Sequence, residues 1–109
     1  MENEFRRNYE VRISESAFEK YHQIQSDTLF NKVTQDMARI GEFPDMGRVY
    51  LPVAYLKDTD FEARECVCGT LYLYYRVVDE AKAVYVLDIR SQRQKPISHT
   101  ELSSFNSEF

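Results

Sequence analysis

The sequence has no tryptophan, and its 109 residues include only two histidines, two cysteines, three glycines and three prolines. No apolar run approaches the roughly 20 residues that a membrane-spanning helix needs. The first eight residues are polar and charged, without the apolar stretch of a signal peptide. We therefore expect neither a membrane protein nor a disulfide-stapled scaffold, but one cytoplasmic domain.

The two cysteines, Cys66 and Cys68, are two positions apart, which in a strand puts both side chains on the same face. Such neighbours are poorly placed to form a disulfide bond with each other. A zinc site needs more ligands, and His22 and His99 are distant in sequence. We expect reduced, metal-free thiols, as is usual in the cytosol, and no cofactor.

The charge balance is acidic, with a formal net charge of −4 and a pI of about 5.2. Proteins that mainly hold nucleic acid are usually basic, because phosphate neutralisation supplies most of their affinity. The acidic total argues against that class, although it does not exclude a local basic patch. With 43% hydrophobic and 14% aromatic residues, the chain has enough apolar material for one packed core.

The first half of the chain carries one strand pattern and two helix patterns. Residues 9–13 alternate apolar and charged side chains, which is typical of a strand. Ser14 or Ser16, and then Ser26 or Asp27, suit helix N-caps. Apolar residues at helical spacing follow each cap: Ala17, Phe18, Tyr21 and Ile24, then Leu29, Phe30, Val33, Met37 and Ile40. Gly41 predicts the end of the second helix.

The second half is rich in β-branched residues, tyrosine and leucine. It predicts three strands, within 62–68, 70–78 and 83–89, separated by short turns and therefore antiparallel. The element order is β-α-α-β-β-β, an α+β pattern with a helical hairpin on a mostly antiparallel four-stranded sheet. We expect a flexible lead-in over residues 1–8, a domain over 9–96 and a mobile tail over 97–109.

Segments spread over residues 9–96 resemble the RelE/ParE toxin superfamily of bacterial type II toxin–antitoxin systems. The segments that carry the resemblance are Val11 to Ala17, Phe43 to Arg48, Arg64-Glu65, Gly69, Leu73 to Val77, Val84 to Ile89 and Arg93 to Pro96. Their order and spacing together are more specific than any one segment. The resemblance implies two helices on a mostly antiparallel sheet, bound by a cognate antitoxin.

The resemblance leaves the activity open. RelE-like members cut messenger RNA on the ribosome, whereas ParE-like members inhibit DNA gyrase without that chemistry. The family's ribonucleases have an arginine early in the third strand, and many have a histidine just beyond the fourth. The matching positions here are Tyr72 and Ser91, so two usual residues are missing. Metal-independent cleavage must activate the 2′-hydroxyl, protonate the leaving oxygen and stabilise charge on the phosphorane.

The remaining candidates are cations and tyrosines of the last two strands. If the chain is a ribonuclease, its catalytic candidates are Arg76, Arg90 and Arg93. The wider target-binding or nucleic-acid-binding set is Tyr72, Tyr74, Arg76, Arg90, Arg93 and Lys95. Tyr72, Tyr74 and Arg76 share one strand face, and we expect it to be exposed if Leu73, Tyr75 and Val77 face the helices. The alternative is an ordinary half-solvated sheet face.

Other polar residues have simpler interpretations. His22 and His99 suit surface packing, and Glu65 suits an ordinary cross-strand pair. Val53, Tyr55 and Leu56 are candidates for the surface that the antitoxin covers. Three hypotheses follow: a toxin that acts by binding, a ribonuclease, and a non-toxic binding module. The acidic balance and the missing residues favour the first or third.

Overall fold

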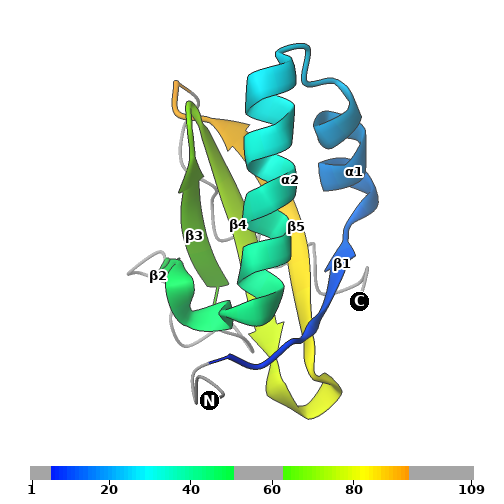
Figure 1. Ribbon diagram of the computed structural model, residues 1–109, viewed down its shortest axis with the longest axis vertical. Coiled ribbons are helices and arrows are strands. Elements are labelled where there is room, and N and C mark those ends of the chain that lie inside the picture. The colour runs from blue at the N-terminus through cyan, green and yellow to red at the C-terminus, as the bar shows by residue number, and fades with distance from the viewer. Residues whose placement is uncertain (1–5, 51–62, 94–109) are drawn as a thin grey trace.

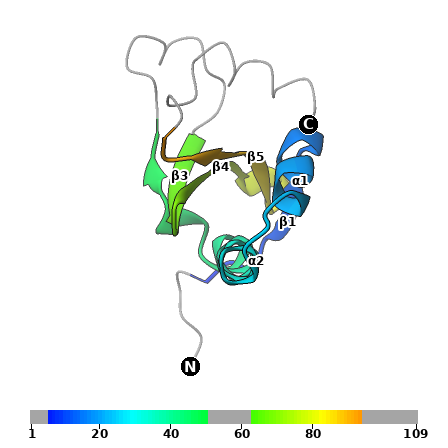
Figure 2. The same cartoon turned by 90° about the horizontal axis from the view of Figure 1, so that it is seen from above.

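The computed structural model describes residues 6–50 and 63–93. They form a five-stranded sheet with two helices, α1 (Glu15–His22) and α2 (Asp27–Glu42) (Figure 1). Seen from above, α2 lies across one face of the sheet and α1 lies beside the β1 edge (Figure 2). Neither helix has the length and apolar character needed to cross a membrane.

The strand order in the sheet is β1-β5-β4-β3-β2. The strands are β1 (Glu10–Ile13), β2 (Arg48–Val49), β3 (Ala63–Cys68), β4 (Leu71–Val78) and β5 (Ala83–Ser91). Only β1 and β5 run parallel; the other neighbouring pairs are antiparallel. The predicted α+β order is confirmed, and the sheet gains a short fifth strand, β2, in the segment predicted as a loop.

Serine side chains begin both helices, as predicted. The Ser14 Oγ accepts a hydrogen bond from the Ala17 N–H at 3.0 Å, and the Ser26 Oγ accepts one from the Leu29 N–H at 3.2 Å. Ser14 also donates to the carbonyl oxygen of Leu87 at 2.8 Å, so the cap of α1 is anchored on β5.

The main core lies between the helices and the sheet. Its buried members are Ala17, Val33, Ile40, Cys66, Cys68, Leu73, Tyr75, Val84, Val86 and Ile89. Phe18 is among the apolar residues at helical spacing in α1, but 49% of its surface is exposed, so it does not share the buried face with Ala17. The centres of the Phe18 and His22 rings lie 4.4 Å apart in an edge-to-face arrangement, which confirms the predicted surface packing of that histidine.

Gly41 has a different role from the predicted helix stop, since α2 continues to Glu42. A Cβ at Gly41 would lie 2.8 Å from the Tyr9 carbonyl oxygen and 2.7 Å from the Val11 Cγ2. The missing side chain lets the segment before β1 cross the helix closely, and the Tyr9 N–H donates to the Gly41 carbonyl at 2.7 Å.

Part of the predicted lead-in also contacts the end of α2. The Arg7 N–H donates to the Glu42 carbonyl at 2.8 Å, and its guanidinium pairs with Asp45 at 2.8 Å. The predictions for Val53, Tyr55, Leu56, Lys95, His99 and the tail over 97–109 lie outside the described residues.

Candidate functional site

The sheet face turned away from α2, called the far face below, carries a second apolar cluster. Its buried members are Ala63, Tyr74, Ala83, Tyr85 and Leu87. The rings of Tyr50 and Tyr72 lie 5.2 Å and 6.2 Å from that of Tyr74. Tyr74 has no exposed surface, so the expectation of an exposed Tyr74 is wrong. The predicted alternation of faces along β4 holds, but aromatic packing on the far face excludes solvent from this side chain.

A row of paired residues crosses the far face. Arg48, Glu65, Tyr74 and Asp88 are opposite one another in succession on β2, β3, β4 and β5. Residues directly opposite in an antiparallel ladder project to the same side. The Arg48 Nε donates to the buried Glu65 carboxylate at 2.7 Å, which confirms the cross-strand pair predicted for Glu65.

The two central tyrosines of β4, Tyr74 and Tyr75, have raised pKa values because they are buried. The nearby Glu65 carboxylate raises the pKa of the Tyr74 hydroxyl further. On the helix-facing side, burial raises the pKa of Tyr75 to about 12, although the hydrogen bond from the Gly47 N–H opposes the shift. Both side chains therefore remain neutral well above neutral pH.

We expect the free energy of unfolding to fall as the pH rises from about 10 toward 12. An unfolded tyrosine ionises near pH 10, whereas the folded-state pKa of Tyr74 and Tyr75 is higher, so the unfolded chain loses these protons first. Their contribution is complete below about pH 10 and is lost as the pH passes through the folded pKa. Urea unfolding at several pH values measures the decline, and Tyr74→Phe should make it shallower. Native-state phenolate absorbance in which all eight tyrosines titrate near pH 10 would contradict this account.

Asp88 is a buried carboxylate held at an irregularity of the sheet. Tyr74 pairs with Asp88 but Tyr75 pairs with Val86, so Leu87 is an extra residue on β5, a β-bulge. The Asp88 carboxylate accepts from the Lys20 ammonium at 2.6 Å and from the Arg90 Nε at 2.9 Å. The buried Asp88 carboxylate at the bulge therefore links Lys20 of α1 with Arg90 near the end of β5.

A second cationic group surrounds Tyr85 at the β1 side. Arg12 on β1 and Arg76 on β4 are each paired with Tyr85, one on either side. Each guanidinium carbon lies 5.6 Å from the centre of the Tyr85 ring, within cation–π range. Arg12 also donates to the Tyr85 hydroxyl at 3.3 Å. The tyrosine holds two like charges on one face of the sheet.

The three arginines proposed as catalytic are spread along the sheet. Arg90 is opposite Tyr72, and Arg76 lies four residues farther along β4, about 13 Å away at the usual strand rise. Arg93 is exposed in the turn that follows β5. The structure brings Tyr72 and Arg90 together and places Arg76 apart from them.

A family model identifies the family of this chain. A family model described as the ParE toxin of the type II toxin–antitoxin system parDE matches residues 11–96. The chain belongs to this toxin family. No curated protein sequence gives a significant match. As a member of the ParE family, the chain is the toxin component of a type II system.

Solved structures show the same fold at low sequence identity. A toxin–antitoxin complex, RelBE2 of Mycobacterium tuberculosis, is 18% identical with a TM-score of 0.61, covering 86% of this chain and 100% of that one. The isolated E. coli RelE toxin is 15% identical with a TM-score of 0.57, covering 93% and 99%. The archaeal RelE–RelB complex of Pyrococcus horikoshii is 14% identical with a TM-score of 0.58, covering 81% and 99%. At these identities the likeness concerns the fold alone.

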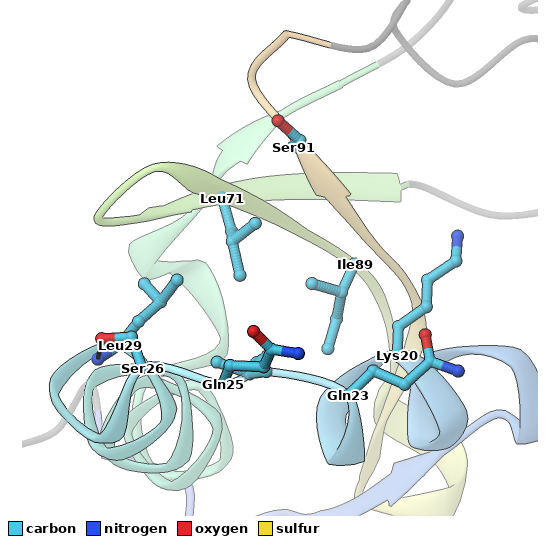
Figure 3. A pocket seen from close by; sticks show the side chains of 9 residues that line it. Lys20, Gln23, Gln25, Ser26, Leu29, Leu71, Ile89 and Ser91 are labelled. Atoms are coloured by element: carbon cyan, nitrogen blue, oxygen red, sulfur yellow. Dashed lines mark hydrogen bonds between the residues drawn. The ribbon is translucent and has the colours of Figure 1, made fainter.

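The ParE-family chain also has an open groove between its helices and the end of the sheet (Figure 3). The groove has a volume of about 370 Å³. Its apolar lining comes from Ile24, Leu29, Leu71 and Ile89, and its polar rim includes Lys20, Gln23, Gln25 and Ser91. Leu71 and Ile89 project into it from β4 and β5. An apolar floor with a polar rim is typical of a ligand-binding site.

Sequence reasoning missed three charged residues of the far face. Arg12 and Arg48 lie outside the last two strands, and only the sheet order reveals that they share a face with Arg76 and Arg90. Asp88 followed the apolar run of the fourth predicted strand, and its burial depends on the bulge. Alternation in β1 carried a signal for Arg12, because it is the charged residue between Val11 and Ile13.

Proposed function

We propose that this ParE-family toxin acts by binding DNA gyrase and is held inactive by a cognate antitoxin. The observation that carries the proposal is that three far-face arginines are each engaged by another side chain of the protein. Arg90 is engaged by buried Asp88, Arg48 by buried Glu65, and Arg76 by the Tyr85 ring. Phosphorane stabilisation requires several donors within roughly 3 Å of one phosphate. Cations that are paired and spread along a sheet suit a broad protein-binding surface better.

The identity of neighbouring side chains supports the same choice. Tyr72 stands where the family's ribonucleases have an arginine, and it faces Arg90 across the ladder. Ser91, which stands in place of the histidine, pairs instead with Leu71 and lines the helix-side groove. Successive pairs along a ladder point to opposite faces, so the two positions are not directed at one reacting group.

The antitoxin partner follows from the family and its relatives. The Mycobacterium tuberculosis, E. coli and Pyrococcus horikoshii toxins of this fold were each crystallised with an antitoxin. We expect the small gene beside this one to encode a DNA-binding antitoxin. Expression of the toxin alone should arrest growth, and co-expression of that gene should restore it. Growth that is normal without the neighbour would indicate the non-toxic binding module.

Two assays on the purified toxin separate gyrase binding from RNA cleavage. The toxin should inhibit DNA supercoiling by gyrase. Arg93→Ala should weaken the inhibition only partly, and the size of the loss should depend on salt concentration, because an exposed cation contributes mainly to long-range attraction. Arg6→Ala makes the same charge change beside Glu42 at the end of α2 and serves as the matched control, with no expected effect. Ribosome-dependent cleavage of messenger RNA by the unaltered toxin, lost in Arg93→Ala, would instead establish the ribonuclease.

A further inference from the structure

Three metal-ligating side chains meet on the helix-facing side of the sheet, outside the far-face site. Cys66 and Cys68 project from β3 toward α2, and Asp36 projects from α2 toward them. One ligand atom from each residue lies within 4.8 Å of the other two. All three side chains are buried, with exposed fractions of 7%, 1% and 2% in the order named. The expectation of metal-free thiols rested on the lack of a third ligand, and α2 supplies one.

We propose that Asp36, Cys66 and Cys68 form a binding site for one thiophilic divalent cation of the zinc class. Two thiolates and a carboxylate are a ligand set that zinc accepts, with water completing a tetrahedron. At a zinc–sulfur distance of about 2.3 Å, the two sulfurs of such a site lie about 3.8 Å apart. In the observed cluster the three ligand atoms lie within 4.8 Å of one another, which is close to the spacing that such a site needs.

Lys32 makes the bound state electrically neutral. Its ammonium contacts both carboxylate oxygens of Asp36, at 3.1 Å and 2.9 Å. Binding of the dication replaces the two thiol protons, which leave to solvent, so the cation's charge is matched by two thiolates. Lys32 keeps one carboxylate oxygen while the metal takes the other. A buried site without net charge avoids the large cost of an unpaired ion.

An ion can reach the cluster from a cavity on its surface side. A cavity of about 450 Å³ is lined by Leu29, Lys32 and the turn residues Gly69 and Thr70, which follow Cys68 in the chain. Because Lys32 is half exposed, its side chain can swing aside and admit an ion from this cavity.

The test uses the purified full chain and zinc or cobalt ions alone. One zinc ion per chain should protect both thiols from a thiol-specific reagent and release two protons, which a weakly buffered pH measurement detects. Cobalt should give the sulfur-to-metal charge-transfer bands and strong visible bands of a tetrahedral thiolate site. Asp36→Asn should weaken zinc binding at least about tenfold, and Cys66→Ala should abolish the charge-transfer bands of a two-thiolate site.

The matched control removes the other candidate zinc ligands. His22→Gln combined with His99→Gln should leave binding unchanged, since His22 lies on the surface of α1 away from the cluster. Circular dichroism establishes that each variant is folded, and thiol protection in the unaltered chain gives a result that depends on no variant. Thiols that react equally fast with and without zinc would overturn the proposal, as would binding that persists in Cys66→Ala and disappears in the histidine variant.

Discussion

Asp88→Asn is expected to lower the free energy of unfolding by about 3 kcal/mol, because removing one member of a buried ion pair leaves its partner uncompensated. The Arg90 side chain is only 14% exposed, and its Nε donates to Asp88. Lys20, at 38% exposed, can turn to solvent, whereas the Arg90 side chain is mostly buried. Urea unfolding monitored by circular dichroism measures the loss.

Glu10→Gln is the matched control for that substitution. It removes a carboxylate that pairs with Arg12 at 3.2 Å, but both side chains are more than half exposed. Exposed pairs of this kind contribute little to stability, so no measurable change is expected. Equal losses in the two variants would show that the burial of Asp88 does not determine its contribution.

Tyr75→Phe is expected to cost about 2–4 kcal/mol, because one hydroxyl satisfies two buried backbone groups. The Tyr75 hydroxyl donates to the Pro44 carbonyl at 2.7 Å and accepts from the Gly47 N–H at 2.9 Å. Both residues are buried, so neither group has water as a replacement. A Cβ at Gly47 would lie 2.6 Å from this hydroxyl, which shows how closely the loop approaches it.

Tyr72→Phe tests whether that cost belongs to the two hydrogen bonds. Tyr72 lies on the same strand, but its hydroxyl makes no hydrogen bond within residues 6–50 and 63–93. Its removal should change the midpoint of unfolding little. If Tyr75→Phe were equally mild, the segment after α2 would be held by contacts other than the Tyr75 hydroxyl, and the protection of its amide groups from hydrogen exchange would be unchanged.

The elements of the fold were predictable because they depend on local chemistry. Ser14 and Ser26 indicate where the helices begin, because N-capping depends only on residues close in sequence. Gly69, with a φ of 60°, occupies the predicted turn between two strands. The two-residue strand β2 was not predictable, because Arg48 and Val49 become a strand only by pairing with Glu65 and Arg64. Short strands are specified by their partners rather than by their own pattern.

The candidate site was predictable only in part, since it depends on contacts between distant segments. Tyr74 was assigned to the correct strand face, but its burial depends on aromatic neighbours such as Tyr50. Asp36 was overlooked because a charged residue in an apolar stripe is ordinarily solvated. Its burial follows from the position of α2 over β3 and from Lys32, and neither is visible along the sequence.

The parallel pairing of β1 with β5 has a consequence for the time at which the toxin forms during synthesis. Glu10 pairs with Ala83, and the Ser14 N–H bonds to the Val86 carbonyl, so the first strand has no partner until the last one is made. At about 5–20 residues per second, translation separates the two strands by roughly 4–15 seconds. Throughout that interval the nascent chain lacks the complete sheet. A toxin arranged in this way cannot complete its sheet, and therefore its folded surfaces, until β5 has been synthesised.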